Sequence, residues 1–211
     1  MNRIAPDPAK SLLLTIDVQL DFTAIGAPAE IPGTAAAVPN MVRLLHAFRA
    51  AGRPIAHMVR LYKEDGSNVD LCRRDRVAGG WKVVGPGSPG SQLVPELVPS
   101  GTELDAPTLL NGHPQRIGDD EWIFYKPRWG AFYQTALEAM LPGWGVNTLV
   151  VCGCNFPNCP RTSIYEASER DLRVMLIDDA MSGVYEQGRK ELENIGVTIS
   201  TTDDCLRWLC P

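Results

Sequence analysis

The 211-residue sequence has no long hydrophobic run, no block of Lys or Arg residues and only three histidines. A membrane-spanning helix needs about 20 consecutive apolar residues, and no stretch of this sequence approaches that length. The first ten residues, MNRIAPDPAK, also lack the apolar core of a signal peptide. We therefore expect a cytoplasmic protein that does not associate with membranes.

The charge and composition narrow the function classes further. The net charge of −5, with no basic stripe, argues against nucleic acid as a partner. The hydrophobic fraction of 45% is ordinary for a globular protein, and the length suits one domain over residues 1–211. In a reducing compartment the six cysteines are expected to be free thiols rather than a disulfide framework.

Short apolar segments alternate with helix-like segments along the chain. In residues 35–52 four apolar side chains share the spacing of one helix face, with Pro39 in the first turn and Gly52 at the end. The predicted strands are 11–18, 54–59, 121–127, 148–153, 173–179 and 197–200; the predicted helices are 35–52, 131–141, 159–170 and 183–196. This alternation predicts a three-layer α/β/α, Rossmann-like fold around a six-stranded, mostly parallel sheet.

We expect the strand order 3-2-1-4-5-6, numbered along the chain, so that strands one and four are neighbours. Residues 61–119 interrupt the alternation as an irregular Gly/Pro-rich insertion, with at most one short helix near 91–97. A long irregular segment in a compact domain is usually functional or flexible.

Ligands of such folds bind beyond the carboxyl ends of the strands. The residues expected there are Asp17, Arg60, Lys126 and the loop 153–159. That loop belongs to a stretch with three cysteines, Cys152, Cys154 and Cys159, whose spacing does not match a structural zinc site.

Cys159 has the features of a nucleophile. Asn158 can cap the next helix and Pro160 suits its first turn, which places the thiol at a helix N-terminus. There the helix dipole favours a thiolate, and free N–H groups can hold an oxyanion. We expect Cys159 to be the most reactive thiol, although an inert, partly buried thiol is the alternative.

Four motifs occur in a fixed order: IDVQLDF (16–22), GSPGSQLVPELVP (87–99), KPRWGAF (126–132) and GCNFPNC (153–159). Together they resemble the isochorismatase-like cysteine hydrolases, which include nicotinamidases and N-carbamoylsarcosine amidohydrolases. The resemblance spans residues 11–200. It implies the isochorismatase-like fold and a catalytic triad of Asp17, Lys126 and Cys159.

These residue types suit amide hydrolysis. A thiolate can attack the weakly electrophilic amide carbonyl, Asp17 can accept and return a proton, and Lys126 supplies a stabilising positive charge. Backbone N–H groups of Asn155 and Cys159 are the expected oxyanion donors. The resemblance also implies a cis peptide bond between Cys154 and Asn155.

Two departures from the family pattern concern the substrate pocket. Phe156 stands where the family has Thr, and Gly130 where it has Ser. Five residues are candidates for substrate binding by position alone: Phe22, Arg60, Tyr62, Trp129 and Phe156. Arg60 would anchor a substrate carboxylate, whereas ordinary core packing is the alternative for the aromatic residues.

A third departure concerns metal. The D-x-H segment of zinc-binding nicotinamidases is missing after strand two, and His46, His57 and His113 are scattered. We expect His46 in solvent and His57 in the core. The sequence therefore predicts no metal and no cofactor.

The resulting prediction is a metal-independent cysteine hydrolase that cleaves a C–N bond of a small amide or N-carbamoyl compound. The reaction would pass through a thioester and release ammonia or an amine. A vinyl-ether hydrolase acting on isochorismate and a non-catalytic, thiol-sensing protein of the same fold are the alternatives. The family resemblance suggests a homodimer or larger homo-oligomer.

Overall fold

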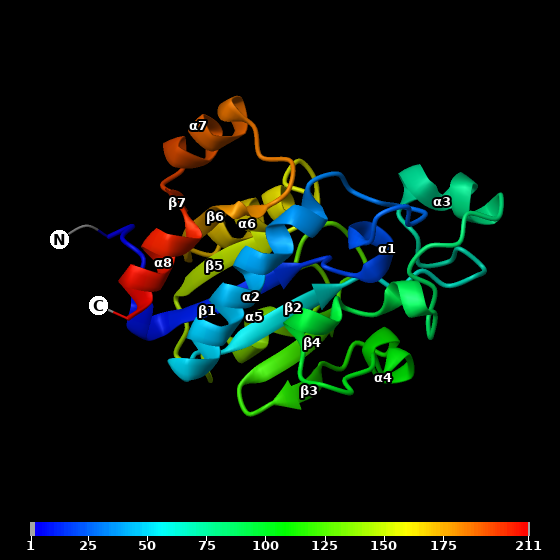
Figure 1. Ribbon diagram of the computed structural model, residues 1–211, viewed down its shortest axis with the longest axis horizontal. Helices are drawn as coiled ribbons and strands as arrows, with labels where there is room; N and C mark the ends of the chain where they lie inside the picture. Colours follow the sequence, from blue (N-terminus) through cyan, green and yellow to red (C-terminus); the bar gives the residue numbers. More distant parts are fainter. Residues whose placement is uncertain (1–2, 211) are drawn as a thin grey trace.

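The computed structural model describes residues 3–210, and within them seven strands form one sheet in the order β3-β4-β2-β1-β5-β6-β7 (Figure 1). The strands are β1 (Ser11–Ile16), β2 (Ile55–Val59), β3 (Gln115–Gly118), β4 (Glu121–Tyr125), β5 (Thr148–Gly153), β6 (Arg173–Met181) and β7 (Thr198–Ser200). All neighbouring pairs are parallel except β3 and β4. The six predicted strands and their order are confirmed, and β3 is an additional edge strand.

The central strands are apolar on both faces because helices cover the sheet on both sides. Every residue of β1, β2 and β5 is buried. The parallel register pairs Leu13 with Val150 and Ile16 with Gly153. Asp17 and Cys154, the next residue of each chain segment, therefore leave the sheet at the same carboxyl edge.

Helices of different lengths form the two outer layers (Figure 1). On one face lie α2 (Thr34–Ala50) and α8 (Thr202–Leu209), which share a core with β1, β5 and β6. On the other face lie α5 (Leu137–Met140), α6 (Cys159–Ser168) and α7 (Glu186–Asn194). The predicted apolar face of α2 is confirmed, since Met41, Leu44, Leu45 and Phe48 are all fully buried.

Two helix predictions need correction. Because α2 begins at Thr34, Pro39 lies inside the helix rather than in its first turn, whereas Gly52 takes the left-handed conformation expected just beyond its end. The helix predicted at 131–141 is reduced to α5. Residues 131–136 form bends and turns instead, where the backbone N–H groups of Ala131 and Phe132 donate to Ser163 and Glu166 on α6.

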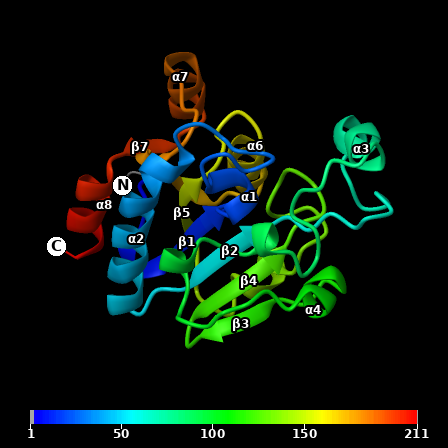
Figure 2. The same ribbon diagram turned by 45° about the vertical axis from the view of Figure 1, so that its right-hand side comes forward.

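The insertion at 61–119 is more ordered than predicted. It contains α3 (Leu71–Ala78), α4 (Ala106–Leu110), the edge strand β3 and two 3-10 turns, Pro89–Ser91 and Pro95–Leu97. A further short helix, α1 (Leu20–Thr23), follows β1, and a 3-10 turn, Pro8–Lys10, precedes it. Figures 1 and 2 show α1 and α3 at the carboxyl end of the sheet, with α3 projecting from its edge.

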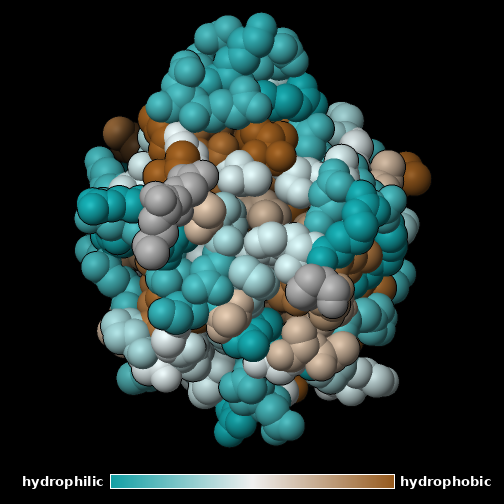
Figure 3. All heavy atoms as spheres, turned by 90° about the vertical axis from the view of Figure 1, so that its left-hand side faces the viewer, coloured by the Kyte–Doolittle hydropathy of each residue, from teal (hydrophilic) through white to brown (hydrophobic). Residues whose placement is uncertain are grey.

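The two ends of the described chain lie on the opposite side of the molecule (Figure 1). Seen from that side, the surface is mainly hydrophilic, with α7 projecting at the top (Figure 3). The residues that converge at a buried polar site lie at the other end of the molecule, where β1, β2, β4 and β5 finish.

Candidate active site

Asp17 ends β1 in an unusual backbone conformation. Its φ of 56° lies in the left-handed region, which Asp tolerates better than most residues and which is common at functional sites. Its N–H donates to the Met58 carbonyl, and its own carbonyl accepts from the Cys154 thiol at 3.0 Å. The backbone of three strands thus holds the Asp17 carboxylate at the sheet edge.

Lys126 follows β4 and is fully buried. Its Nζ lies 2.9 Å from Asp17 Oδ2, which makes a buried ion pair. Among residues 3–210, Asp17 Oδ1 has no hydrogen-bond partner. One carboxylate oxygen is therefore neutralised by lysine and the other remains able to accept a proton.

Cys159 is the first residue of α6 and only 4% exposed. Burial raises the pKa of its thiol, and the charge of Asp17 raises it further, whereas Lys126 and Arg60 lower it. Taken together these effects raise the pKa of the Cys159 thiol, the opposite of the direction expected from the helix start alone.

The turn before Cys159 differs from its prediction. The expected cis bond between Cys154 and Asn155 is wrong, because all peptide bonds among residues 3–210 are trans. Gly153, with a φ of 125°, turns the chain, and the N–H groups of Cys154 and Phe156 bond to carbonyls of Ile16 and Ser182.

The N–H groups of Asn155 and Cys159 have no hydrogen-bond acceptor within the described part of the chain. Asn158 precedes α6, but its amide donates to the Asn155 side chain rather than capping the helix. Pro160 occupies the first turn as predicted.

Arg60 is brought to the nucleophile from the end of β2. Its guanidinium is 1% exposed and lies 3.9 Å from Cys159 Sγ and 3.0 Å from the Asp70 carboxylate. The Arg60 Cζ is 5.5 Å from the centre of the Trp129 ring and 5.7 Å from that of Tyr62. Three of the five predicted pocket residues therefore gather around the Arg60 guanidinium, which itself reaches Cys159.

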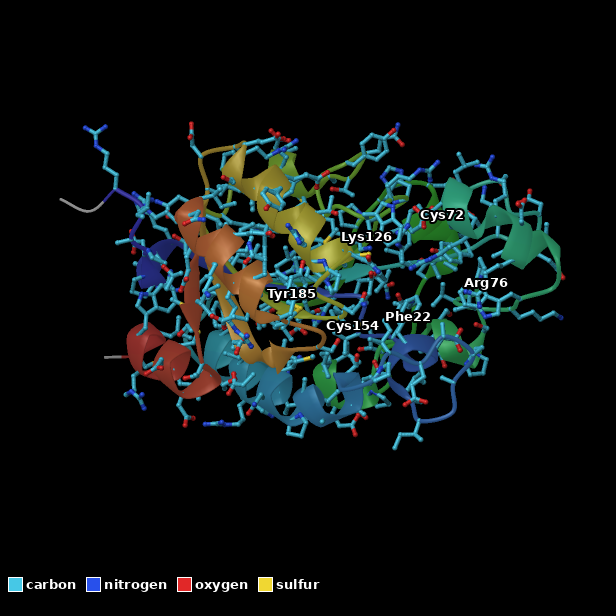
Figure 4. All side chains as sticks on the ribbon, turned by 90° about the horizontal axis from the view of Figure 1, so that it is seen from above. Phe22, Cys72, Arg76, Lys126, Cys154 and Tyr185 are labelled. Carbon is cyan, nitrogen blue, oxygen red and sulfur yellow. The ribbon has the colours of Figure 1, made fainter. Side chains whose placement is uncertain are left out.

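The other two predicted pocket residues lie differently. Phe22 packs with Tyr62 and Cys154 in a small apolar cluster next to this group. Phe156 is fully buried, and its ring meets Tyr185 edge-on at 5.4 Å, directly against Gly188 of α7. In Figure 4 Lys126, Cys154 and Phe22 lie at the strand ends, and Tyr185 lies to the side of α7.

Three residues of the site were not identified from the sequence. Gln19 donates to the carbonyls of Arg60 and Ser91 and accepts from the Arg60 N–H, which fixes the end of β2. Its place in the motif IDVQLDF was the signal that could have identified it. Asp70 and Arg73, which both bond to Tyr62, lie in the insertion, where no local pattern marks them.

Two cavities open beside the cluster, and neither is lined by Asp17, Lys126 or Cys159 within residues 3–210. One, of about 620 Å³, lies between Tyr62, Trp81 and Gly90. The other, of about 430 Å³, is lined by Asp70, Leu71, Cys72, Arg128 and Trp129. The thiol is thus closed off from solvent in this conformation.

The histidines take no part in the site. His57 lies inside the sheet between Thr15 Oγ1 at 2.8 Å and Glu121 Oε1 at 2.9 Å, as expected of a core residue, and His46 is exposed. Across residues 3–210, no group of three or more His, Cys, Asp and Glu side chains could hold a metal ion. All six cysteines, each of which lies in the described chain, are free. None of the helices in residues 3–210 is long and apolar enough to cross a membrane.

Comparison with known proteins places this arrangement in a family. The Isochorismatase domain family matches residues 11–204. A probable inactive nicotinamidase of Arabidopsis thaliana is 30% identical over 197 residues, which cover 90% of this chain and 91% of that protein. An N-carbamoylsarcosine amidase of Arthrobacter sp. is 25% identical over 206 residues, covering 93% of this chain and 70% of the amidase.

The crystal structure of an isochorismatase family protein from Desulfovibrio vulgaris superposes with a TM-score of 0.78 at 31% identity, covering 94% of this chain and 98% of that one. The match to the family covers most of the chain, and the fold agrees with it over nearly its whole length. The protein therefore belongs to the isochorismatase family of hydrolases, and several of its relatives are named amidases or amidohydrolases.

Proposed function

We propose that this protein is a metal-independent cysteine hydrolase that cleaves a C–N bond of a small amide or N-carbamoyl compound. The supporting observation is the buried pair of Lys126 and Asp17 at 2.9 Å, with the second Asp17 oxygen unpartnered and the Cys159 thiol beside it. A nucleophile, a base and a fixed positive charge at one site are what acyl transfer from nitrogen requires.

In the first half-reaction Asp17 takes the thiol proton as Cys159 Sγ attacks the carbonyl carbon. Because burial raises the pKa of the thiol, the attack depends on Asp17 as the acceptor of the thiol proton. The free N–H groups of Asn155 and Cys159 are the donors we assign to the oxyanion. Protonated Asp17 then gives its proton to the leaving nitrogen, which departs as ammonia or an amine and leaves a thioester.

In the second half-reaction Asp17 removes a proton from water, and the hydroxide adds to the thioester carbonyl. The intermediate collapses to a carboxylic acid, or to a carbamic acid for an N-carbamoyl substrate. The Cys159 sulfur leaves and recovers its proton from Asp17. Lys126 keeps its charge throughout and stabilises the Asp17 carboxylate whenever that carboxylate is ionised.

The test is release of ammonia from a panel of simple amides, ureido acids and carbamoylated amino acids. Wild type should release ammonia from at least one compound, Cys159→Ser should not, and the control Cys210→Ser, at an exposed and remote thiol, should match wild type. Ammonia release by Cys159→Ser would refute the nucleophile assignment. A vinyl ether, the substrate type of the alternative hydrolase, yields no ammonia.

A non-catalytic role is the second candidate, and the closure of the site favours it. Cys159 is nearly inaccessible and lines neither cavity. No turnover of any compound in the panel, by a protein with the expected fold, would support that candidate. A small-molecule substrate, a cytoplasmic location and a homodimer or larger assembly remain predictions.

A further inference from the structure

The helix α3 adjoins the site without being part of the core, since its first residues line the cavity beside Trp129. None of its residues, Leu71–Ala78, is buried, and Leu71 is 80% exposed. Only Val77 packs against an apolar cluster. Figure 2 shows the helix standing away from the sheet at the end where the strands finish. An element with so little buried apolar surface is held in place mainly by its polar contacts.

Asp70 supplies the most buried of those contacts, and Arg73 of α3 adds a hydrogen bond to the Tyr62 hydroxyl and a contact with the Trp129 ring. Asp70 occupies the position before the first residue of α3, where an aspartate usually accepts a hydrogen bond from the N–H groups of its own helix. Its side chain makes no such bond within the described chain. The carboxylate is 2% exposed and points the other way, 3.0 Å from Arg60 and 2.9 Å from the Tyr62 hydroxyl, which donates to it.

Arg60 links this carboxylate to the nucleophile. Two of its nitrogens hold the two oxygens of Asp70, at 3.3 and 3.0 Å, and one of these nitrogens is also 3.9 Å from Cys159 Sγ. Its Nε is buried and has no partner among residues 3–210. A guanidinium that binds one carboxylate with two donors, next to the attacking atom, has the geometry of a carboxylate subsite.

We propose that Asp70 occupies this subsite in place of a substrate and thereby latches the start of α3 against the site. A substrate carboxylate takes the place of Asp70 on Arg60, α3 moves outward with Asp70 into solvent, and Cys159 becomes accessible. The exchange leaves Arg60 paired before and after, whereas a neutral amide could displace Asp70 only by leaving Arg60 buried and uncompensated, and so leaves the latch closed. The site therefore selects amides or ureides that also bear a carboxylate. This inference rests on the proposed function, since it names the substrate class of the same site.

Thiol labelling tests the latch without turnover. Iodoacetamide labelling of Cys159 is measured by peptide mass analysis relative to Cys210, an exposed thiol remote from α3. Asp70→Asn should raise this ratio at least about tenfold, since loss of a buried charge pair strongly favours opening. The matched control Asp75→Asn, at an exposed position of α3, should leave it unchanged. An Asp70→Asn protein with native circular dichroism and the wild-type ratio would overturn the proposal.

A second measurement uses wild type alone, in case Asp70→Asn does not fold. Iodoacetate carries a carboxylate and iodoacetamide does not. The iodoacetate labelling rate divided by the iodoacetamide labelling rate, measured at Cys210, gives the intrinsic difference in reactivity between the two reagents. At Cys159 the same ratio should be higher, because Arg60 binds the iodoacetate carboxylate. An equal or lower ratio would contradict the subsite.

The two ideas can fail separately. If the latch is wrong but the proposed function holds, ammonia is released and neutral amides react as fast as their carboxylate-bearing counterparts. If the proposed function is wrong but the latch holds, labelling responds to Asp70→Asn while no ammonia is released from any compound.

Discussion

Replacing Lys126 by methionine isolates the contribution of the buried ion pair. Lys126 Nζ is fully enclosed and lies 2.9 Å from Asp17 Oδ2. Methionine keeps much of the volume of the side chain but removes the charge. The Asp17 carboxylate is then buried without its cation, and its other oxygen has no partner in the described chain to compensate.

The expected loss of stability is large for a single substitution. Removing one partner of a buried pair typically costs about 3–5 kcal/mol, because the remaining charge is uncompensated. The matched control is Lys190→Met, which breaks an exposed pair with Glu186 at 3.2 Å. An exposed pair contributes about 0–1 kcal/mol, so the control should change the free energy of unfolding very little.

Urea unfolding at pH 7, followed by fluorescence and circular dichroism, measures both variants. The double variant Lys126→Met/Asp17→Asn should recover part of the stability lost in Lys126→Met, since it removes the orphaned charge as well. Activity should fall by about 10²–10³-fold in Lys126→Met, the usual cost of removing one group that stabilises charge during the reaction. A Lys126→Met protein as stable as Lys190→Met would refute the buried pair.

Three further predictions address other parts of the structure. Burial raises the pKa of Glu121, but hydrogen bonds from Arg49 and His57 have the larger combined effect and lower it to about 2. Because the folded chain binds the ionised carboxylate more strongly, these contacts stabilise the fold fully above the unfolded pKa near 4.5. Urea titrations should show Glu121→Gln less stable by roughly 3 kcal/mol at pH 7, with the difference vanishing as pH falls toward 2, and a pH-independent difference would contradict this. Gly188→Ala should lower the Tm, although alanine usually stabilises a helix, because its Cβ would lie 2.4 Å from the Phe156 ring; a raised Tm would mean that the ring lies elsewhere. Activity should survive dialysis against a strong chelator, and loss that zinc restores would disprove metal independence.

The sheet was predictable because its signal is local. The strands are short apolar runs buried on both faces, and the alternation with helices determines a parallel sheet with few possible orders. Since the functional side chains follow directly after strands, Asp17, Arg60 and Lys126 could be assigned to one edge before their contacts were known. The structure brings all three within one buried group.

The errors arose where contacts between distant segments override local preference. Residues 131–136 look helical, yet they fold as bends and turns that bond to Ser163 and Glu166 of α6. The helix start at Cys159 favours a thiolate locally, yet burial and Asp17, which is 142 positions away, decide the pKa. Asp70 sits in a segment without periodicity, and only the folded chain places it on Arg60.

The central claim is that Cys159 forms a covalent acyl-enzyme during hydrolysis of a C–N bond. The most direct measurement is to quench wild type during turnover of a compound that releases ammonia and to map the peptides by mass. The account predicts the acyl group of that compound on the peptide with Cys159, and none in Cys159→Ser. Ammonia release with no adduct on Cys159 at any quench time, and with full activity in Cys159→Ser, would contradict it.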